Sequence, residues 1–321
     1  MKVTVKYVLA FGDRRGTGNP AGVVLEGGAL SEAQCLSIAA EVGASETAFL
    51  SVDSPGSIAA RFFTPLKKIP FCGHATIAAF SVARDTGMLP EGSHLVNRGP
   101  REFSVEISGS EVFMRQQEYQ EFVLDSSAVE EVRGEVFRSG LGEPTAMVIG
   151  YTGVRFLLVH LPAESLLPEV EVSQEALYRF SEKHDLVGMY AFAEKEGPRA
   201  PRGTSGSAQG AGRSGGGPAG EGSNDEGRGE RVSGPVISAR MFAPYYGIEE
   251  ESATGRAAGP AAHYLVSRHY LQATRFTIEQ GRYMPEPSPS IIHAWFSPGD
   301  SRGRVRIGGG AYLDSERSVS V

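Results

Sequence analysis

An internal repeat constrains the fold of this chain more than any other feature of its sequence. Residues 60–65 (Ala-Arg-Phe-Phe-Thr-Pro) recur as residues 239–244 (Ala-Arg-Met-Phe-Ala-Pro). Shortly after each copy, a glycine-containing turn opens a run of small residues, first at 72–76 and again at 253–257. Because these features follow in the same order in both copies, the sequence indicates two halves of one design.

Hydrophobic patterning predicts strands that alternate with helices in both halves. In the first half we expect strands at 2–10, 22–26, 46–52 and 60–63, helices at 31–42 and 75–83, and a hairpin over 102–116. In the second half we expect strands at 154–160, 189–193, 236–242 and 305–313, and helices that begin near 172 and span 257–268. Residues 46–49 and 189–192 align as counterparts in the repeat. The sequence therefore predicts an α+β protein with halves at 1–117 and 118–321, whose final strand can pack with the N-terminal half.

A glycine-rich segment at 195–235 interrupts the second half of the repeat. Most of its other residues are Ser, Pro, Arg and Glu, which bury too little apolar surface to offset the entropy lost on ordering. Loop-closure entropy rises only logarithmically with length, so the fold should tolerate a long insertion. We expect a disordered loop between two strands.

Composition restricts the class of protein. The 321 residues are 40% hydrophobic and 21% charged, which is typical of a globular chain long enough for two domains. The net charge of −7 and the lack of basic runs argue against a nucleic-acid partner. No apolar stretch approaches the length of a membrane span, and alternation at Val3, Val5 and Tyr7 favours a strand over a signal peptide. We expect a cytoplasmic protein without a membrane partner.

The two glycine turns are candidates for substrate binding. Each places backbone N–H groups at the positive end of a helix, around Gly73 and Gly255, where a carboxylate can bind. If a pseudo-twofold axis relates the halves, both helix ends face one cleft between them. The turns then indicate a small anionic metabolite as the ligand. The alternative is that they are only well-packed helix starts.

Glu46 and His74 are the candidate proton-transferring groups. Glu46 lies among small and apolar residues, and partial burial would raise its pKa toward the range useful for proton transfer. His74 follows the first turn glycine and could orient a substrate or relay a proton. The alternatives are an exposed strand glutamate and a structural histidine.

The two cysteines, Cys35 and Cys72, form neither a disulfide framework nor a metal-binding set on spacing alone. Cys72 would have a lowered pKa at a helix N-terminus and could act as a base. A two-thiol racemase, however, needs a second cysteine near 251–254, where the sequence has none. A carboxylate base is therefore favoured over a thiol.

The chain resembles the PhzF-like family of phenazine-biosynthesis isomerases, which belongs to the diaminopimelate epimerase superfamily. The resemblance runs from about residue 5 to about 315, apart from the glycine-rich segment. The motifs that carry it are GNPAGVV at 18–24, SETAF at 45–49, FCGHAT at 71–76, RMFAP at 240–244 and ATG at 253–255. It implies two similar domains, each a curved sheet around a central helix, with the active site between them. It also implies catalysis without metal or organic cofactor, with Glu46 moving a proton beside His74, and homodimerisation.

The sequence departs from the family pattern at several site positions. Glu251 stands where the family has an aspartate, and Arg256 where it has a serine; the arginine could clamp a carboxylate or crowd the pocket. Lys67 and Lys68 stand where the family has an acidic residue, and a Gln-Gly motif survives at 280–281. These changes leave the mechanism class in place and the substrate open.

Taken with the resemblance, these residues predict a cofactor-independent isomerase that moves a proton on a small carboxylate-bearing substrate. The predicted catalytic residues are Glu46, His74 and Glu251. The predicted substrate-binding residues are Asn19, Gly73, Thr76, Thr254, Gly255 and Arg256. No metal is expected. The alternative is a non-catalytic metabolite-binding or scaffold protein on the same fold.

Overall fold

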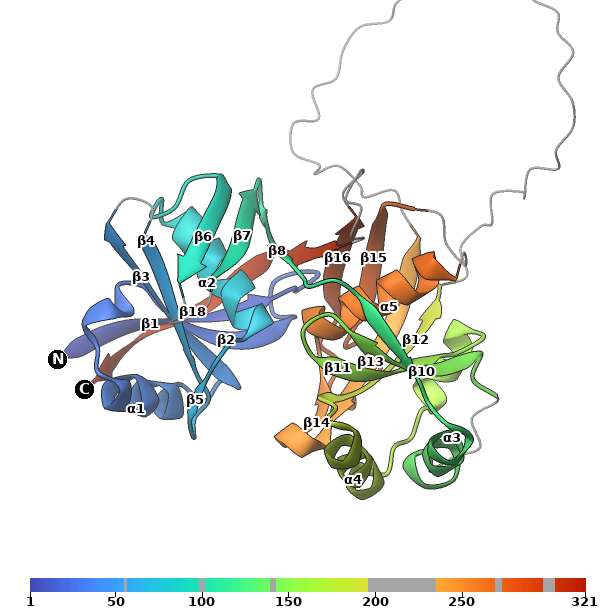
Figure 1. The fold of residues 1–321 in the computed structure, drawn as a ribbon. Helices are drawn as coiled ribbons and strands as arrows, with labels where there is room; N and C mark the ends of the chain where they lie inside the picture. The colour runs from blue at the N-terminus through green and yellow to red at the C-terminus, as the bar shows by residue number, and fades with distance from the viewer. Residues whose placement is uncertain (55–56, 98–101, 139–142, 196–234, 269–272, 297–303) are drawn as a thin grey trace, which may run out of the picture.

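The computed structural model describes residues 1–54, 57–97, 102–138, 143–195, 235–268, 273–296 and 304–321. It consists of two lobes side by side, with both chain termini in the N-terminal lobe (Figure 1). The segment predicted to be disordered lies, from 196 to 234, outside the described residues. Within the described part, no helix is long and apolar enough to cross a membrane.

The N-terminal lobe is built from the first eight strands and two helices. Its strands are β1 (Lys2–Ala10), β2 (Asn19–Val24), β3 (Glu46–Ser54), β4 (Ser57–Phe63), β5 (Lys68–Ile69), β6 (Gly92–Asn97), β7 (Glu102–Ser108) and β8 (Glu111–Arg115). Its helices are α1 (Glu32–Val42) and α2 (Gly73–Asp85), with a 3-10 turn η1 (Gly27–Ala29). As predicted, a helix follows Ser31 and stops at Gly43, which adopts a left-handed φ of 70°. The structure adds that Ser31 and Gln34 form a capping box at the start of α1.

The C-terminal lobe repeats this arrangement with additions. Its strands are β9 (Gln120–Val123), β10 (Ala146–Tyr151), β11 (Arg155–His160), β12 (Gly188–Glu194), β13 (Val236–Ala243), β14 (Ile248–Glu251), β15 (Arg275–Gln280), β16 (Ser290–Phe296) and β17 (Val305–Gly309). Its helices are α3 (Ser126–Glu131), α4 (Gln174–His184) and α5 (Gly255–Ser267), with short turns η2 (Val132–Val136), η3 (Glu164–Glu169) and η4 (Pro244–Tyr246).

Helices α2 and α5 occupy the interior of their lobes. In α2 every residue from His74 to Ala83 is buried, and in α5 the consecutive small residues 257–262 are buried, together with Tyr264 and Leu265. Small side chains let the surrounding strands approach these helices closely on all sides. The small-residue runs in the sequence therefore mark the two central helices, and one hydrophobic core joins both of them.

Strand pairing corrects the alignment of the two halves by one residue. Thr47 on β3 lies opposite Phe63, and Met189 on β12 lies opposite Phe242. Because Phe63 and Phe242 are equivalent in the repeated hexapeptide, Thr47 corresponds to Met189 and Glu46 to Gly188. The predicted match of 46–49 with 189–192 was wrong because a shared Ala-Phe pair outweighed the register that backbone pairing sets.

The predicted final strand at 305–313 is in fact two strands that serve different lobes. β17 pairs with β16 in the C-terminal lobe and with β8. After Gly310, β18 (Ala311–Ser320) runs back into the N-terminal lobe and pairs with β1 along its whole length (Figure 1). The sequence therefore shows one continuous apolar run where the chain passes from the C-terminal lobe to the N-terminal lobe.

Candidate active site

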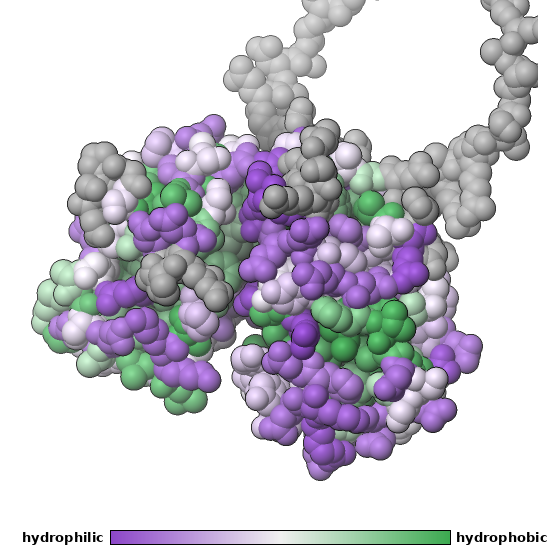
Figure 2. Space-filling model, viewed as in Figure 1, coloured by the Kyte–Doolittle hydropathy of each residue, from purple (hydrophilic) through white to green (hydrophobic). Residues whose placement is uncertain are grey.

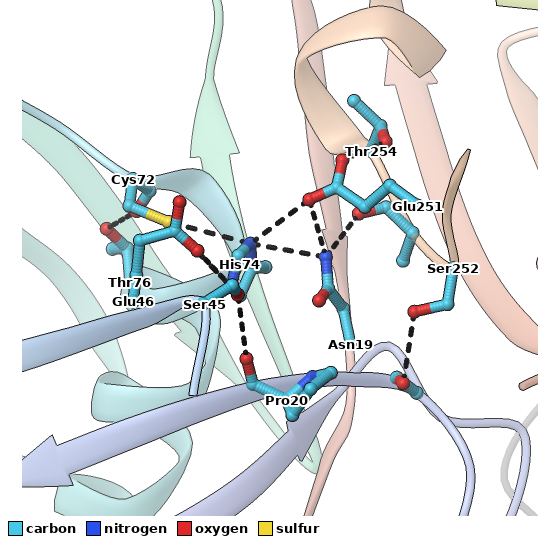
Figure 3. A network of polar contacts seen from close by, with 12 residues as sticks. Asn19, Pro20, Ser45, Glu46, Cys72, His74, Thr76, Glu251, Ser252 and Thr254 are labelled. Carbon is cyan, nitrogen blue, oxygen red and sulfur yellow. Dashed lines mark hydrogen bonds and ion pairs between the residues drawn. The ribbon is translucent and has the colours of Figure 1, made fainter. Parts of the chain in front are cut away.

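Three titratable side chains from the two lobes meet where α2 begins. Glu46 is the first residue of β3, His74 the second of α2, and Glu251 the last of β14. The His74 Nε2 atom lies 3.3 Å from Glu46 Oε2, and its Nδ1 atom lies 3.8 Å from Glu251 Oε1. The imidazole thus stands between two carboxyl groups, one from each lobe (Figure 3).

Regular backbone structure fixes each of these positions. Cys72 is extended and precedes α2, so His74 falls in the first helical turn. Glu46 lies opposite Ala21 in the parallel pairing of β2 and β3, and Glu251 lies opposite Met241 in the antiparallel pairing of β13 and β14. Catalytic side chains held on strands and a helix are positioned more tightly than side chains on loops.

The pKa of Glu46 is displaced downward, against the prediction from its sequence. Burial acts to raise this pKa, but contact with His74, its charge and a contact with Ser45 outweigh burial and lower it. The apolar neighbours of Glu46 along the chain give no sign of the imidazole that lowers its pKa. Oε2 of Glu46 is buried and accepts no well-aligned hydrogen bond from the described residues. Glu46 is therefore an ionised carboxylate with bonding capacity left over.

The pKa of Glu251 is displaced in the opposite direction. Its burial raises the pKa, and the opposing effects of the His74 charge and of hydrogen bonds from Thr254 and Asn19 are too small to reverse the shift. Burial acts to lower the pKa of His74, yet Cys72 and Glu46 raise it well above the ordinary value. The site thus holds a carboxyl group with a lowered pKa, an imidazole with a raised pKa and a second carboxyl group with a raised pKa.

Asn19 links the two lobes beside this triad. Its Nδ2 atom donates to Glu251 Oε1 and to the Ala253 carbonyl, each at 2.9 Å, and lies 3.3 Å from Nδ1 of His74. Asn19 is buried on β2, whereas Glu251 and Ala253 belong to the C-terminal lobe. The predicted binding residue therefore contacts the catalytic candidates directly.

The two glycine turns differ in what they offer a ligand. A Cβ added to Gly73 would meet its nearest atom, Met114 Cε, at 3.6 Å, so the first turn is loosely surrounded. A Cβ on Gly255 would approach Ile307 to 3.0 Å, and the Thr254 N–H donates to Gln280 Oε1 at 3.1 Å. The expectation that both turns present free N–H groups therefore fails for Thr254.

Two other predicted binding residues have different neighbours from those expected. Thr76 is buried within α2, and its hydroxyl donates to the Cys72 carbonyl at 2.7 Å, so it supports the turn. The guanidinium carbon of Arg256 lies 5.6 Å from the centre of the Phe71 ring, in a cation–π contact that joins the two lobes.

Cys72 is a buried free thiol whose Sγ lies 3.5 Å from His74 Nδ1. Burial raises its pKa and outweighs the effect of the imidazole charge. The lowered pKa suggested by its place at a helix N-terminus is therefore wrong, because enclosure of the sulfur dominates over the helix dipole. This result disfavours a thiol base.

The sequence analysis missed the residues that hold the second turn in place. Gln280 Nε2 donates to the Glu251 carbonyl at 2.7 Å, while its Oε1 accepts from Thr254 and, at 3.2 Å, from the Tyr190 hydroxyl. The surviving Gln-Gly motif was the available signal for Gln280. Ser45, whose Oγ lies 3.5 Å from His74 Nε2, was flagged only by its place beside Glu46.

The surface is hollowed between the two lobes, in the view of Figure 2, by a deep notch. The triad draws its members from both lobes, as a site between them must. Opposed carboxyl pKa values around one imidazole are suited to moving a proton within a bound molecule.

Comparisons with known proteins show which family the chain matches. A family model described as "Phenazine biosynthesis-like protein" matches residues 8–191 and 227–317. An uncharacterized isomerase of Clostridium acetobutylicum is 29% identical over 275 residues, which cover 83% of this chain and 80% of the relative. The trans-2,3-dihydro-3-hydroxyanthranilate isomerase of Pseudomonas chlororaphis is 27% identical over 312 residues, covering 94% and 95%.

Solved structures agree on the fold. A PhzF-family protein of Bacillus anthracis superposes with a TM-score of 0.78 at 20% identity, covering 100% of both chains. A hydroxyproline epimerase of Agrobacterium vitis superposes with a TM-score of 0.56 at 12% identity, covering 99% of this chain and 92% of that one. The predicted epimerase-like α+β fold is confirmed. The chain belongs to the phenazine biosynthesis-like protein family and is an isomerase.

Proposed function

We propose that this isomerase shifts a proton on a small carboxylate-bearing substrate without a cofactor, with Glu46 as the base. The observation that carries the proposal is the opposed displacement of the pKa values of Glu46 and Glu251 on either side of His74. Environments that push two carboxyl pKa values apart assign one group as base and the other as acid. The protein thus supplies both proton-transfer roles from its own side chains.

In the proposed reaction, Glu46 takes a proton from a substrate carbon and the carbon keeps the bonding electrons. Cationic His74, in contact with Glu46, stabilises the negative charge that develops on the substrate. A proton then returns to a different carbon, either from Glu46 or from Glu251. In the second case, the proton held by Glu46 passes back to Glu251 before the next turnover. The substrate neither gains nor loses atoms, so the net change is an isomerisation.

The start of α2 supports a carboxylate anchor. The helix has 13 residues, and Gly73 leaves its first position without a side chain. A helix N-terminus of this kind attracts anions through its unpaired N–H groups and its dipole. The relative from Pseudomonas chlororaphis is named for trans-2,3-dihydro-3-hydroxyanthranilate, so that compound is the first substrate to test.

The test is hydrogen exchange at carbon in heavy water, followed by NMR on a panel of cyclic and α-amino carboxylates. We expect Glu46→Gln to slow exchange by about 100- to 10,000-fold while ligand binding persists. Glu41→Gln is the matched control, because Glu41 is exposed on α1. Full exchange by Glu46→Gln would refute the assignment of the base. Binding without exchange on any compound would support the alternative, a metabolite-binding protein.

A further inference from the structure

Glu46, Cys72 and His74 place three different donor atoms around one point. Their carboxylate oxygen, sulfur and ring nitrogen all lie within 4.8 Å of one another. The Nε2 atom of His74 is 3.3 Å from Glu46 Oε2 and 3.9 Å from Cys72 Sγ. The proposed reaction uses the carboxylate and the imidazole but leaves the thiol without a role. Figure 3 shows all three side chains turned toward one another.

These separations are close to those of ligands around a tetrahedral zinc ion, and one of them matches. Zinc binds sulfur at about 2.3 Å and nitrogen or oxygen at about 2.0–2.2 Å, so neighbouring ligands lie about 3.3–3.6 Å apart. The observed nitrogen–oxygen distance falls in this range, and the sulfur needs to move by only a few tenths of an ångström to reach its own. The buried Oε2 of Glu46 accepts no well-aligned hydrogen bond from the described residues and faces His74 Nε2 at 3.3 Å, so both atoms can turn their lone pairs to an ion once the imidazolium proton has left.

We infer that Glu46, Cys72 and His74 form a binding site for a borderline-soft divalent cation of the zinc class. Binding displaces the thiol proton of Cys72 and one imidazolium proton of His74 into solvent. The thiolate and the carboxylate then balance the two positive charges of the ion, and the neutral imidazole is the third ligand. A water molecule completes the tetrahedron.

The surroundings of His74 favour this role. When Nε2 binds the ion, Nδ1 faces Glu251 Oε1 at 3.8 Å, and a movement of less than about 1 Å would let this carboxyl group accept the ring N–H and orient the metal-bound histidine. Hard cations such as Mg²⁺ prefer all-oxygen ligand sets, so the mixed set selects zinc-like ions over them.

The consequence for activity rests on the proposed function. An ion held by Glu46 and His74 removes the base and the cationic imidazole at once, so zinc inhibits proton transfer. Ion binding itself does not depend on the reaction, and the two proposals can therefore fail separately.

Cobalt is the spectroscopic probe for the full-length protein, because Co²⁺ bound to a thiolate gives a charge-transfer absorption. We expect this band in the wild type and in Cys35→Ser, and its loss in Cys72→Ser. Cys35 is the matched control, since it is the second buried free cysteine and lies on α1, outside the site. A wild type that shows no band, or a band that persists in Cys72→Ser, would overturn the inference.

Calorimetric titration with Zn²⁺ tests the other ligands. We expect Glu46→Gln and Cys72→Ser each to weaken zinc binding by about 100-fold or more, while Cys35→Ser binds as the wild type does. Equal affinity in all four proteins would place any bound zinc elsewhere and refute the site. Carbon-bound hydrogen exchange, measured without zinc, reports separately on the proposed function.

Discussion

The two halves of the molecule share a scaffold but divide the active-site residues between them. Strand pairing makes Glu46 equivalent to Gly188 and Glu251 equivalent to Ile69, since Glu251 lies opposite Met241 and Ile69 opposite Phe62. His74 likewise matches Arg256 at the start of the central helix. Each half therefore supplies titratable groups at positions where the other has none or an arginine. The two halves therefore contribute different residues to one proposed site between them.

The repeated arginines show the opposite pattern, because both serve the scaffold. Arg61 donates to the carbonyls of Gly27 and Leu30 around η1. Arg240 donates in the same way to two carbonyls around η3, and in addition forms a buried bidentate pair with Glu250. The residue of the first half that is equivalent to Glu250 is Lys68, which instead contacts Glu32 on the surface. Arg61 and Arg240 are thus equivalent and both bind backbone carbonyls, but only Arg240 also has a carboxylate partner.

The largest effect on stability should come from the buried ion pair that only the C-terminal half contains. Glu250→Ala leaves the Arg240 charge buried without its carboxylate, and we expect a loss of about 3–5 kcal/mol in the free energy of unfolding. Lys68→Ala, the equivalent change in the other half, removes only an exposed pair and should leave the denaturation midpoint unchanged. Urea denaturation measures both. Equal losses would show that the halves depend on these positions alike.

The next effect concerns activity and tests whether one carboxyl group from each half is required. We expect Glu251→Gln to slow carbon-bound hydrogen exchange by about 100-fold, as general acid catalysis contributes on this scale. In the wild type, the rate should fall as pH drops through the lowered pKa of Glu46 and fall again as pH rises through the raised pKa of Glu251.

Because a glutamine side chain does not titrate, Glu251→Gln should remove the contribution of Glu251 to the fall in exchange rate at alkaline pH. Glu250→Gln is the neighbouring control, and its folded fraction should keep both arms of the pH profile. An unaltered profile in Glu251→Gln would assign the alkaline arm to His74 alone.

A smaller effect should follow from giving the second half a side chain where the first half has Glu46. In Gly188→Ala the new Cβ would lie 2.1 Å from the Phe242 carbonyl oxygen, so the backbone must shift. We expect a loss of about 1–3 kcal/mol in thermal or urea unfolding, typical of overpacking. Gly134→Ala is the control, since its Cβ would meet nothing within 4 Å. A fully stable Gly188→Ala would mean that this half can also accept a side chain there.

The smallest effect should come from the hydrogen bond that supports the second turn. Tyr190→Phe removes the hydroxyl that donates to Gln280 at 3.2 Å, in a position where the first half has Ala48. We expect a loss of about 1 kcal/mol, the usual net contribution of one hydrogen bond, with only a slight change in exchange rate. A loss of activity far beyond the loss of stability would instead give Tyr190 a role in positioning Glu251.

Much of the fold followed from local patterns. The capped helices α1 and α4, the small-residue helices α2 and α5, and the β7–β8 hairpin lie where apolar spacing, serine caps and glycine stops predict them. Strands β5, β9 and β14 were missed because two to four residues carry too little periodicity to be recognised. The longer strands β6, β10, β15 and β16 were not predicted either, so the pattern found only part of the sheet.

The sequence by itself determined the repeat, the family resemblance and the chemical candidates Glu46, His74 and Glu251, because each depends on residue order and type alone. Only the tertiary structure decided how those groups ionise. Contact with His74 lowers the pKa of Glu46, whereas burial raises the pKa of Glu251 despite the opposing charge of His74, and no neighbour along the chain reveals either effect. The tertiary structure also showed that Glu46 and Gly188 occupy equivalent positions in the two halves. Hydrogen bonding between strands, not local similarity, fixes this equivalence.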